Sequence, residues 1–139
     1  MRRFVTGCVM AASLLLLLVL AAPASADRPT QMGPFVEAFE DENPCNGLVH
    51  TVTIATTFAV HSHDGRFVAH GDRALSTSSG FLGKGASSFV DNGQIEMFRF
   101  TDILSNDSGD RIRANGVFVV DLSTGTVRVD KFELTCLGS

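Results

Sequence analysis

Three histidines close together in the sequence have a spacing that could do chemistry. His61 and His63 are two apart among β-forming residues, so both side chains point to one face of an extended strand. If Asp64-Gly65 forms a two-residue turn, His70 lies diagonally beside His61 on the next strand. Imidazole is the commonest transition-metal ligand in proteins, so His61, His63 and His70 are candidate metal ligands. No cysteine or carboxylate completes a known ligand spacing, and these histidines lie on a strand face that we expect to be solvated, so we commit to no metal site.

Arginine and carboxylate residues on neighbouring strands form a second candidate site. Arg73 shares the face of its strand that carries apolar residues, while Glu96 and Asp102 lie on the face opposite Arg99. An inward arginine with a carboxylate could orient a polar ligand or polarise a substrate, and a cross-strand salt bridge is the alternative. His50 falls on the apolar face, where we expect a hydrogen-bonded core residue. These patterns alone do not identify a catalytic or ligand-binding residue.

A glycine-rich run at 80–88 resembles a phosphate loop only in composition. It lacks the G-x-x-x-x-G-K-[ST] spacing, and no helix is predicted after it. The small residues at 83, 85 and 87 leave little side-chain volume on one face, which predicts either a cavity or tight curvature. A G-x-S-x-G nucleophile elbow is also missing from the sequence. Catalysis is therefore uncertain, and we expect no cofactor.

Short hairpins between β-rich runs must position these residues. Turn signals recur about every dozen residues after Gly47, and the runs between them are rich in Val, Ile, Thr and Phe. This pattern predicts an all-β antiparallel meander of about six strands in a domain spanning 45–139. We expect a small closed barrel, with a two-sheet sandwich as the alternative. The predicted strands are 48–62, 66–77, 81–90, 94–104, 111–121 and 127–136.

The segment at 27–44 reads as an acidic leader that contains three prolines. One helical turn or a short edge strand could form between Pro34 and Pro44. The acidic run at 40–42 is expected to be solvated.

Residues 1–26 have the three-part layout of a secretory signal peptide. Arg2 and Arg3 precede an apolar run, and Ala24-Ser25-Ala26 offers a cleavage site. Cleavage would leave 113 residues with nine basic side chains against 15 acidic ones. This acidic balance argues against nucleic-acid binding and against membrane association after cleavage. We expect a secreted protein, or a periplasmic one where the source has an outer membrane.

Two cysteines remain after the signal segment, at Cys45 and Cys136. In an exported chain they are expected to pair, with a bridge between chains or two free thiols as the alternatives. An intrachain bridge would join the two ends of the predicted meander.

Several short motifs, in order, resemble a group of small exported bacterial proteins. The chain has E-N-P-C at 42–45, a D-G-R hairpin at 64–66 and L-T-C at 134–136. The resemblance implies a secreted β-rich domain, and it brings no known activity. Likeness to calycin barrels is one of architecture alone.

Together these features predict a secreted β-barrel that binds a small apolar ligand or a partner without catalysis. One alternative is a cofactor-free isomerase or cyclase that uses an inward arginine and a carboxylate. The other is a surface domain that meets a metal or another protein.

Overall fold

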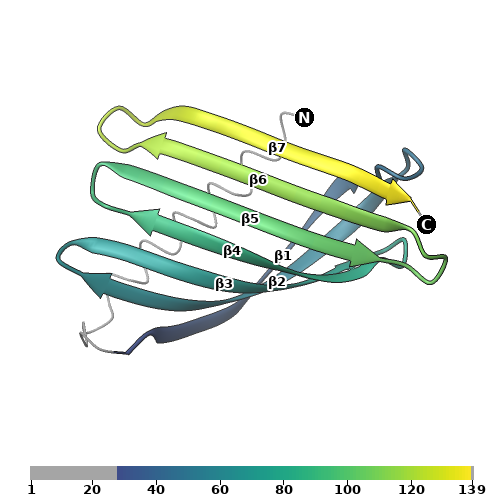
Figure 1. Ribbon diagram of the computed structural model, residues 1–139, viewed down its shortest axis with the longest axis horizontal. Coiled ribbons are helices and arrows are strands. Elements are labelled where there is room, and N and C mark those ends of the chain that lie inside the picture. Colours follow the sequence, from purple (N-terminus) through teal and green to yellow (C-terminus); the bar gives the residue numbers. More distant parts are fainter. Residues whose placement is uncertain (1–27, 139) are drawn as a thin grey trace.

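A single antiparallel sheet of seven strands forms residues 28–138 of the protein. The computed structural model describes residues 28–138, and each strand pairs with the next one along the chain (Figure 1). The all-β meander is therefore confirmed. The strands are β1 (Thr30–Glu42), β2 (Val49–His63), β3 (Arg66–Thr77), β4 (Leu82–Asp91), β5 (Ile95–Ser105), β6 (Arg111–Asp121) and β7 (Thr126–Gly138).

The hairpin turns lie where the sequence predicts them. Asp64 and Gly65 form the two-residue turn between β2 and β3, with His63 opposite Arg66. Both turn residues have positive φ, which the short polar side chain of Asp64 tolerates and the lack of a side chain at Gly65 allows. The predicted bounds of β3 and β6 match the structure, and those of the other four predicted strands shift by one or two residues.

The prediction of six strands is wrong, because the acidic segment before Cys45 adds a seventh. Of the two alternatives for this segment, the structure has the edge strand, β1, and it is longer than expected. Phe35 and Phe39 lie opposite Thr56 and Val52 of β2, and a bulge between Met32 and Phe35 shifts the register. Proline and charged residues make this segment look like a loop in the sequence. An edge strand tolerates both, because one side of it makes no backbone hydrogen bonds to another strand.

The prediction of a closed barrel is not confirmed. Among the described residues, β1 and β7 each pair with one strand, and their Cα atoms stay more than 8 Å apart throughout. An odd number of meander strands makes the two edges run in the same direction, so they cannot join as another antiparallel pair. The sheet curls so that β1 and β2 pass behind β5–β7 (Figure 1). It is one sheet, so the two-sheet sandwich is not formed either.

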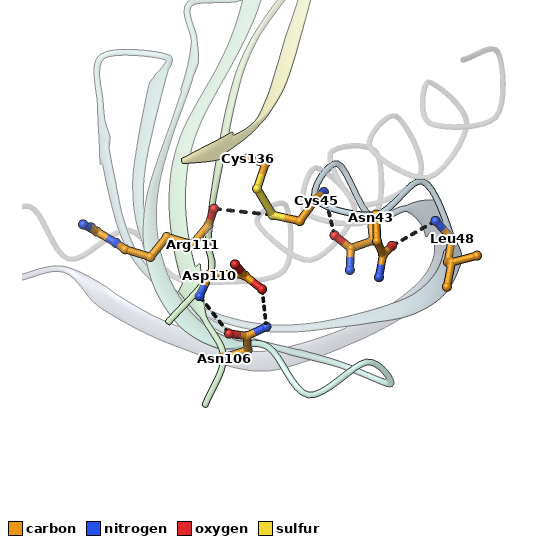
Figure 2. The surroundings of a disulfide bond; sticks show 8 residues. Asn43, Cys45, Leu48, Asn106, Asp110, Arg111 and Cys136 are labelled. Atoms are coloured by element: carbon orange, nitrogen blue, oxygen red, sulfur yellow. Dashed lines mark hydrogen bonds between the residues drawn. A yellow bond between two sulfur atoms is a disulfide. The ribbon is translucent and has the colours of Figure 1, made fainter. Parts of the chain in front are cut away.

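A disulfide ties the two edges of the sheet at one end. Cys45, in the loop after β1, bonds to Cys136 near the end of β7, with a Cα–Cα distance of 5.0 Å (Figure 2). Asn43 shapes this loop: its Oδ1 accepts from the Cys45 N–H at 2.9 Å, and its N–H donates to the Leu48 carbonyl at 2.9 Å. The predicted intrachain bridge is present, and β1 and β7 converge there and diverge at their other ends (Figure 1).

Two apolar clusters occupy the inner, curled face of the sheet. The disulfide-end cluster contains the buried side chains of Ile54, Leu75, Phe81, Leu104 and Ile112. Phe39 of β1 and Leu134 of β7 both pack against it. The far-end cluster contains Phe58, Val60, Ala69 and Phe89. Arg73 and Asp102 lie between these clusters on the inner face.

Candidate functional site

A buried arginine and aspartate meet in the middle of the inner face. Register places Arg73 of β3, Gly85 of β4 and Asp102 of β5 side by side. Because Gly85 has no side chain, Arg73 reaches across β4: its Nε and Nη2 donate to Asp102 Oδ1 and Oδ2 at 2.9 and 3.0 Å. A Cβ at Gly85 would overlap Asp102 Oδ1. The two side chains are only 6% and 2% exposed, so the fold holds a dry, bidentate ion pair.

The surroundings of this pair are apolar on one side. The Arg73 guanidinium carbon lies 4.8 Å from the centre of the Phe100 ring, a cation–π distance. Burial raises the pKa of Asp102, and the charge and hydrogen bonds of Arg73 oppose that rise. Arg73 is thus both neutralised and oriented by the protein itself.

Glu37 of β1 joins the pair from the first strand of the sheet. It is half-buried on the inner face and interacts electrostatically with both Arg73 and Asp102. Burial raises the pKa of Glu37 above its ordinary value of 4.5, Arg73 lowers it, and Asp102 adds to the rise. This carboxyl group therefore takes up a proton more readily than a solvated glutamate, as general acids and ligand-sensing groups do.

Ser87 of β4 adds a polar atom that has no partner. The residue is 6% exposed, and no hydrogen bond reaches its buried Oγ in the described part of the chain. It lies opposite Gly71, where a Cβ would overlap the same Oγ. A buried hydroxyl without a partner is uncommon and marks a position that a ligand atom or a water could satisfy.

The small residues of the inner face serve close packing. Leu104 fills the space beside Gly83, Asp102 the space beside Gly85, and Phe100 the space beside Gly116. The glycine-rich run predicts either a cavity or tight curvature, and at Gly83 and Gly85 neighbouring atoms fill the space that a cavity would need.

Apolar side chains near the open side of the curl remain partly exposed. Phe98, Phe100 and Phe132 form a row with ring centres 5.9 and 6.1 Å apart, and Phe132 is 44% exposed. Part of the apolar surface of this row therefore stays exposed.

The other sequence-predicted residues lie apart from this cluster. Arg99 is exposed on the outer face. Glu96 lies beyond the far-end cluster, near Asp91. Burial raises the pKa of Glu96, and the charge of Asp91 adds to the rise. His50 is a buried residue whose Nδ1 hydrogen-bonds Ser79 Oγ at 2.6 Å, and burial lowers its pKa. Among the arginine and carboxylate candidates, only Arg73 and Asp102 meet.

The three histidines have the predicted register but do not form a metal site. His61, His63 and His70 are exposed on the outer face. His63 Nε2 lies 3.0 Å from Asp64 Oδ2. Within residues 28–138, no group of three or more His, Cys, Asp or Glu side chains is placed to hold a metal ion.

Sequence reasoning missed Glu37 and Ser87. Glu37 lies in the segment interpreted as a leader, although its spacing of two from both Phe35 and Phe39 is the alternation of a strand. The sequence pattern identifies Ser87 only as a small residue of the glycine-rich run.

Comparison with known proteins adds no relative. The chain matches no protein-family profile, no curated protein and no solved structure. No helix in the described part of the chain is long and apolar enough to cross a membrane.

Proposed function

We propose that the protein is a secreted, non-catalytic binding module that takes an apolar small molecule against its inner face. The observation that carries this proposal is the partly exposed row of Phe98, Phe100 and Phe132 beside a buried polar cluster. Small-molecule sites combine apolar walls with a few polar groups that fix orientation, and this face has both. Among the phenylalanines of the inner face, Phe58 and Phe89 are buried and Phe67, Phe98 and Phe118 are half-buried, so apolar area remains available.

Glu37 is the group that meets the polar end of such a ligand. Asp102 already neutralises Arg73 with two hydrogen bonds, so the pair offers no net charge. The Glu37 carboxyl group is half-buried and only partly compensated, which favours a hydrogen-bond donor or a cation. The ligand class is an apolar chain or ring that carries an amine or a hydroxyl group.

Catalysis is the second candidate, and the raised pKa of Glu37 favours it. A carboxylic acid beside a fixed Arg–Asp pair has the elements of general acid–base chemistry without a cofactor, as an isomerase or cyclase requires. Consumption of a bound ligand, lost in Glu37→Gln while binding persists, would favour this candidate.

Export is part of the proposal. The signal segment at 1–26 lies outside the described residues, and the Cys45–Cys136 bond is compatible with an oxidising compartment. The resemblance to small exported bacterial proteins stays a prediction.

Titration with dodecylamine, dodecanol and dodecanoate, monitored by native mass spectrometry, tests the proposal. We expect the amine to bind most tightly and the carboxylate least, because Glu37 repels an anion. Glu37→Gln should remove the preference for the amine, whereas Glu133→Gln on the outer face should keep it. Equal binding of all three molecules, or none, would refute a site at Glu37.

A further inference from the structure

A second cluster of polar side chains lies at the disulfide end of the sheet, apart from Arg73 and Asp102. Ser79, in the turn between β3 and β4, places its Oγ 2.6 Å from Nδ1 of His50, near the start of β2. Ser79 is exposed, whereas His50 is only 6% exposed. An accessible hydroxyl group therefore meets a buried imidazole, which is the pairing of a nucleophile with its base.

Hydrogen bonds at both ends of this turn fix the position of Ser79. Ser78 donates its N–H to the Thr51 carbonyl of β2, and its Oγ accepts from the Thr51 N–H, both at 2.9 Å. Thr77 donates its N–H to the Phe81 carbonyl at 2.9 Å, and its Oγ1 accepts from the Phe81 N–H at 3.0 Å. Phe81 is 2% exposed and anchors the turn in the core. The hydroxyl group of Ser79 is thus carried by a pre-organised turn.

The groups around the Ser79 hydroxyl suit the loss of its proton to the histidine. Thr77 Oγ1 lies 3.1 Å from Ser79 Oγ and can donate its own hydrogen there. When the ring proton of His50 is on Nε2, Nδ1 accepts from the Ser79 hydroxyl group. The Ser79 N–H makes no hydrogen bond within residues 28–138, so it is available to a developing oxyanion.

Asp41 of β1 adds a negative charge to this cluster. It is half-buried and lies directly opposite His50 in the register of β1 and β2. Burial lowers the pKa of His50, and the charge of Asp41 opposes that lowering. The imidazole is therefore neutral and ready to accept a proton near neutral pH, and Asp41 stabilises the imidazolium ion that results.

We propose that Ser79 is a nucleophile that accepts an acyl group from carboxylic esters, with His50 as its base and Asp41 as the stabilising charge. Ser79 Oγ attacks the carbonyl carbon of the ester, and its proton passes to His50 Nδ1. The bond from that carbon to the alkoxy oxygen then breaks, and the leaving alcohol takes the proton from His50. The products are an acyl ester of Ser79 and a free alcohol.

Reaction of the purified chain with an alkyl fluorophosphonate, mapped by peptide mass spectrometry, tests the nucleophile. The serine oxygen displaces fluoride from phosphorus, and the stable product marks the residue. Ser78 is the matched control within the same protein, because it is exposed in the same turn and its Oγ contacts a backbone N–H instead of a histidine. We expect Ser79 to react about a hundredfold faster than Ser78, or more, which is the size of general-base assistance. Equal rates at the two serines, or no reaction at Ser79, would overturn the proposal.

Reaction with p-nitrophenyl acetate tests the acyl donor. We expect a burst of p-nitrophenolate and one acetyl group on Ser79, and Ser79→Ala should lose both. Acetylation that leaves Ser79 unmodified would contradict the proposed class of donor.

The variant His50→Gln distinguishes a base from a structural partner of Ser79. Glutamine can hydrogen-bond the serine but cannot take its proton, so phosphonylation of Ser79 should slow about a hundredfold or more. His61→Gln, at an exposed position of the outer face, should leave the rate unchanged. An unchanged rate in a folded His50→Gln variant would overturn the proposal.

Nitrogen NMR of the wild-type imidazoles supplies a test that does not depend on the folding of any variant. We expect the proton of neutral His50 on Nε2, whereas a proton on Nδ1 would make His50 the donor to Ser79 and overturn the proposal. The cluster shares no residue with the site proposed for ligand binding at Glu37. Phosphonylation and the dodecylamine titration therefore fail independently of each other.

Discussion

Replacement of Asp102 by asparagine should destabilise the fold more than any other single change of charge. Asparagine keeps the size of the side chain but removes the charge that balances Arg73, and both side chains are almost fully buried. Removal of one partner from a buried pair costs about 3–5 kcal/mol, because the other charge stays desolvated and unpaired. In a domain of this size that loss lowers the melting temperature by roughly 10–20 °C.

Urea unfolding followed by circular dichroism measures this effect. Asp72→Asn, on the exposed outer face one residue from Arg73, is the matched control and should stay within about 0.5 kcal/mol of the wild type. Arg73→Met combined with Asp102→Asn removes both charges and should be more stable than Asp102→Asn alone. A loss below about 1 kcal/mol for Asp102→Asn, or a double variant less stable than the single one, would refute the reasoning.

Three further predictions concern the same inner face and its disulfide. Gly85→Ala should cost about 1–3 kcal/mol in urea unfolding, because its Cβ displaces Asp102, and a wild-type midpoint would contradict the packing described. Burial raises the pKa of Glu37, so its contribution to stability is fully present below 4.5 and is lost as pH rises through the folded-state pKa. As pH rises from 4.5 through the folded-state pKa, the Glu37→Gln variant should therefore become more stable relative to the wild type. A difference in unfolding free energy between the two proteins that does not change with pH would refute this assignment. Loss of the Cys45–Cys136 bond by double serine substitution should cost about 4–5 kcal/mol, from the chain entropy of a 91-residue separation, and an unchanged melting temperature would contradict it.

Much of the fold follows from local signals in the sequence. Turn residues such as Asp64-Gly65 set the hairpin register, and period-two alternation places Arg73 inward. The strand β1 could not be recognised as such because Pro34 and the acidic residues after it are typical of loops as well as of sheet edges. Closure could not be predicted either, since it depends on whether the number of strands is even or odd.

The site is less visible in the sequence than the fold. The sequence places Arg73 and Asp102 on candidate strands, but their meeting depends on Gly85 leaving the space between them open. Glu37 interacts electrostatically with the pair across the curl of the sheet, a long-range property that no local pattern encodes. The histidines show the converse: correct local register places them on the outer face, where they form no ligand group.

Methyl-resolved NMR during a dodecylamine titration tests the central claim most directly. Ligand binding against the inner face predicts shift changes at Leu104 and Ile112, which are buried there, and none at Val36 and Leu82, which are exposed on the outer face. Shift changes confined to Val36 and Leu82, or no change at any of the four residues at saturating amine, would contradict a binding site on the inner face.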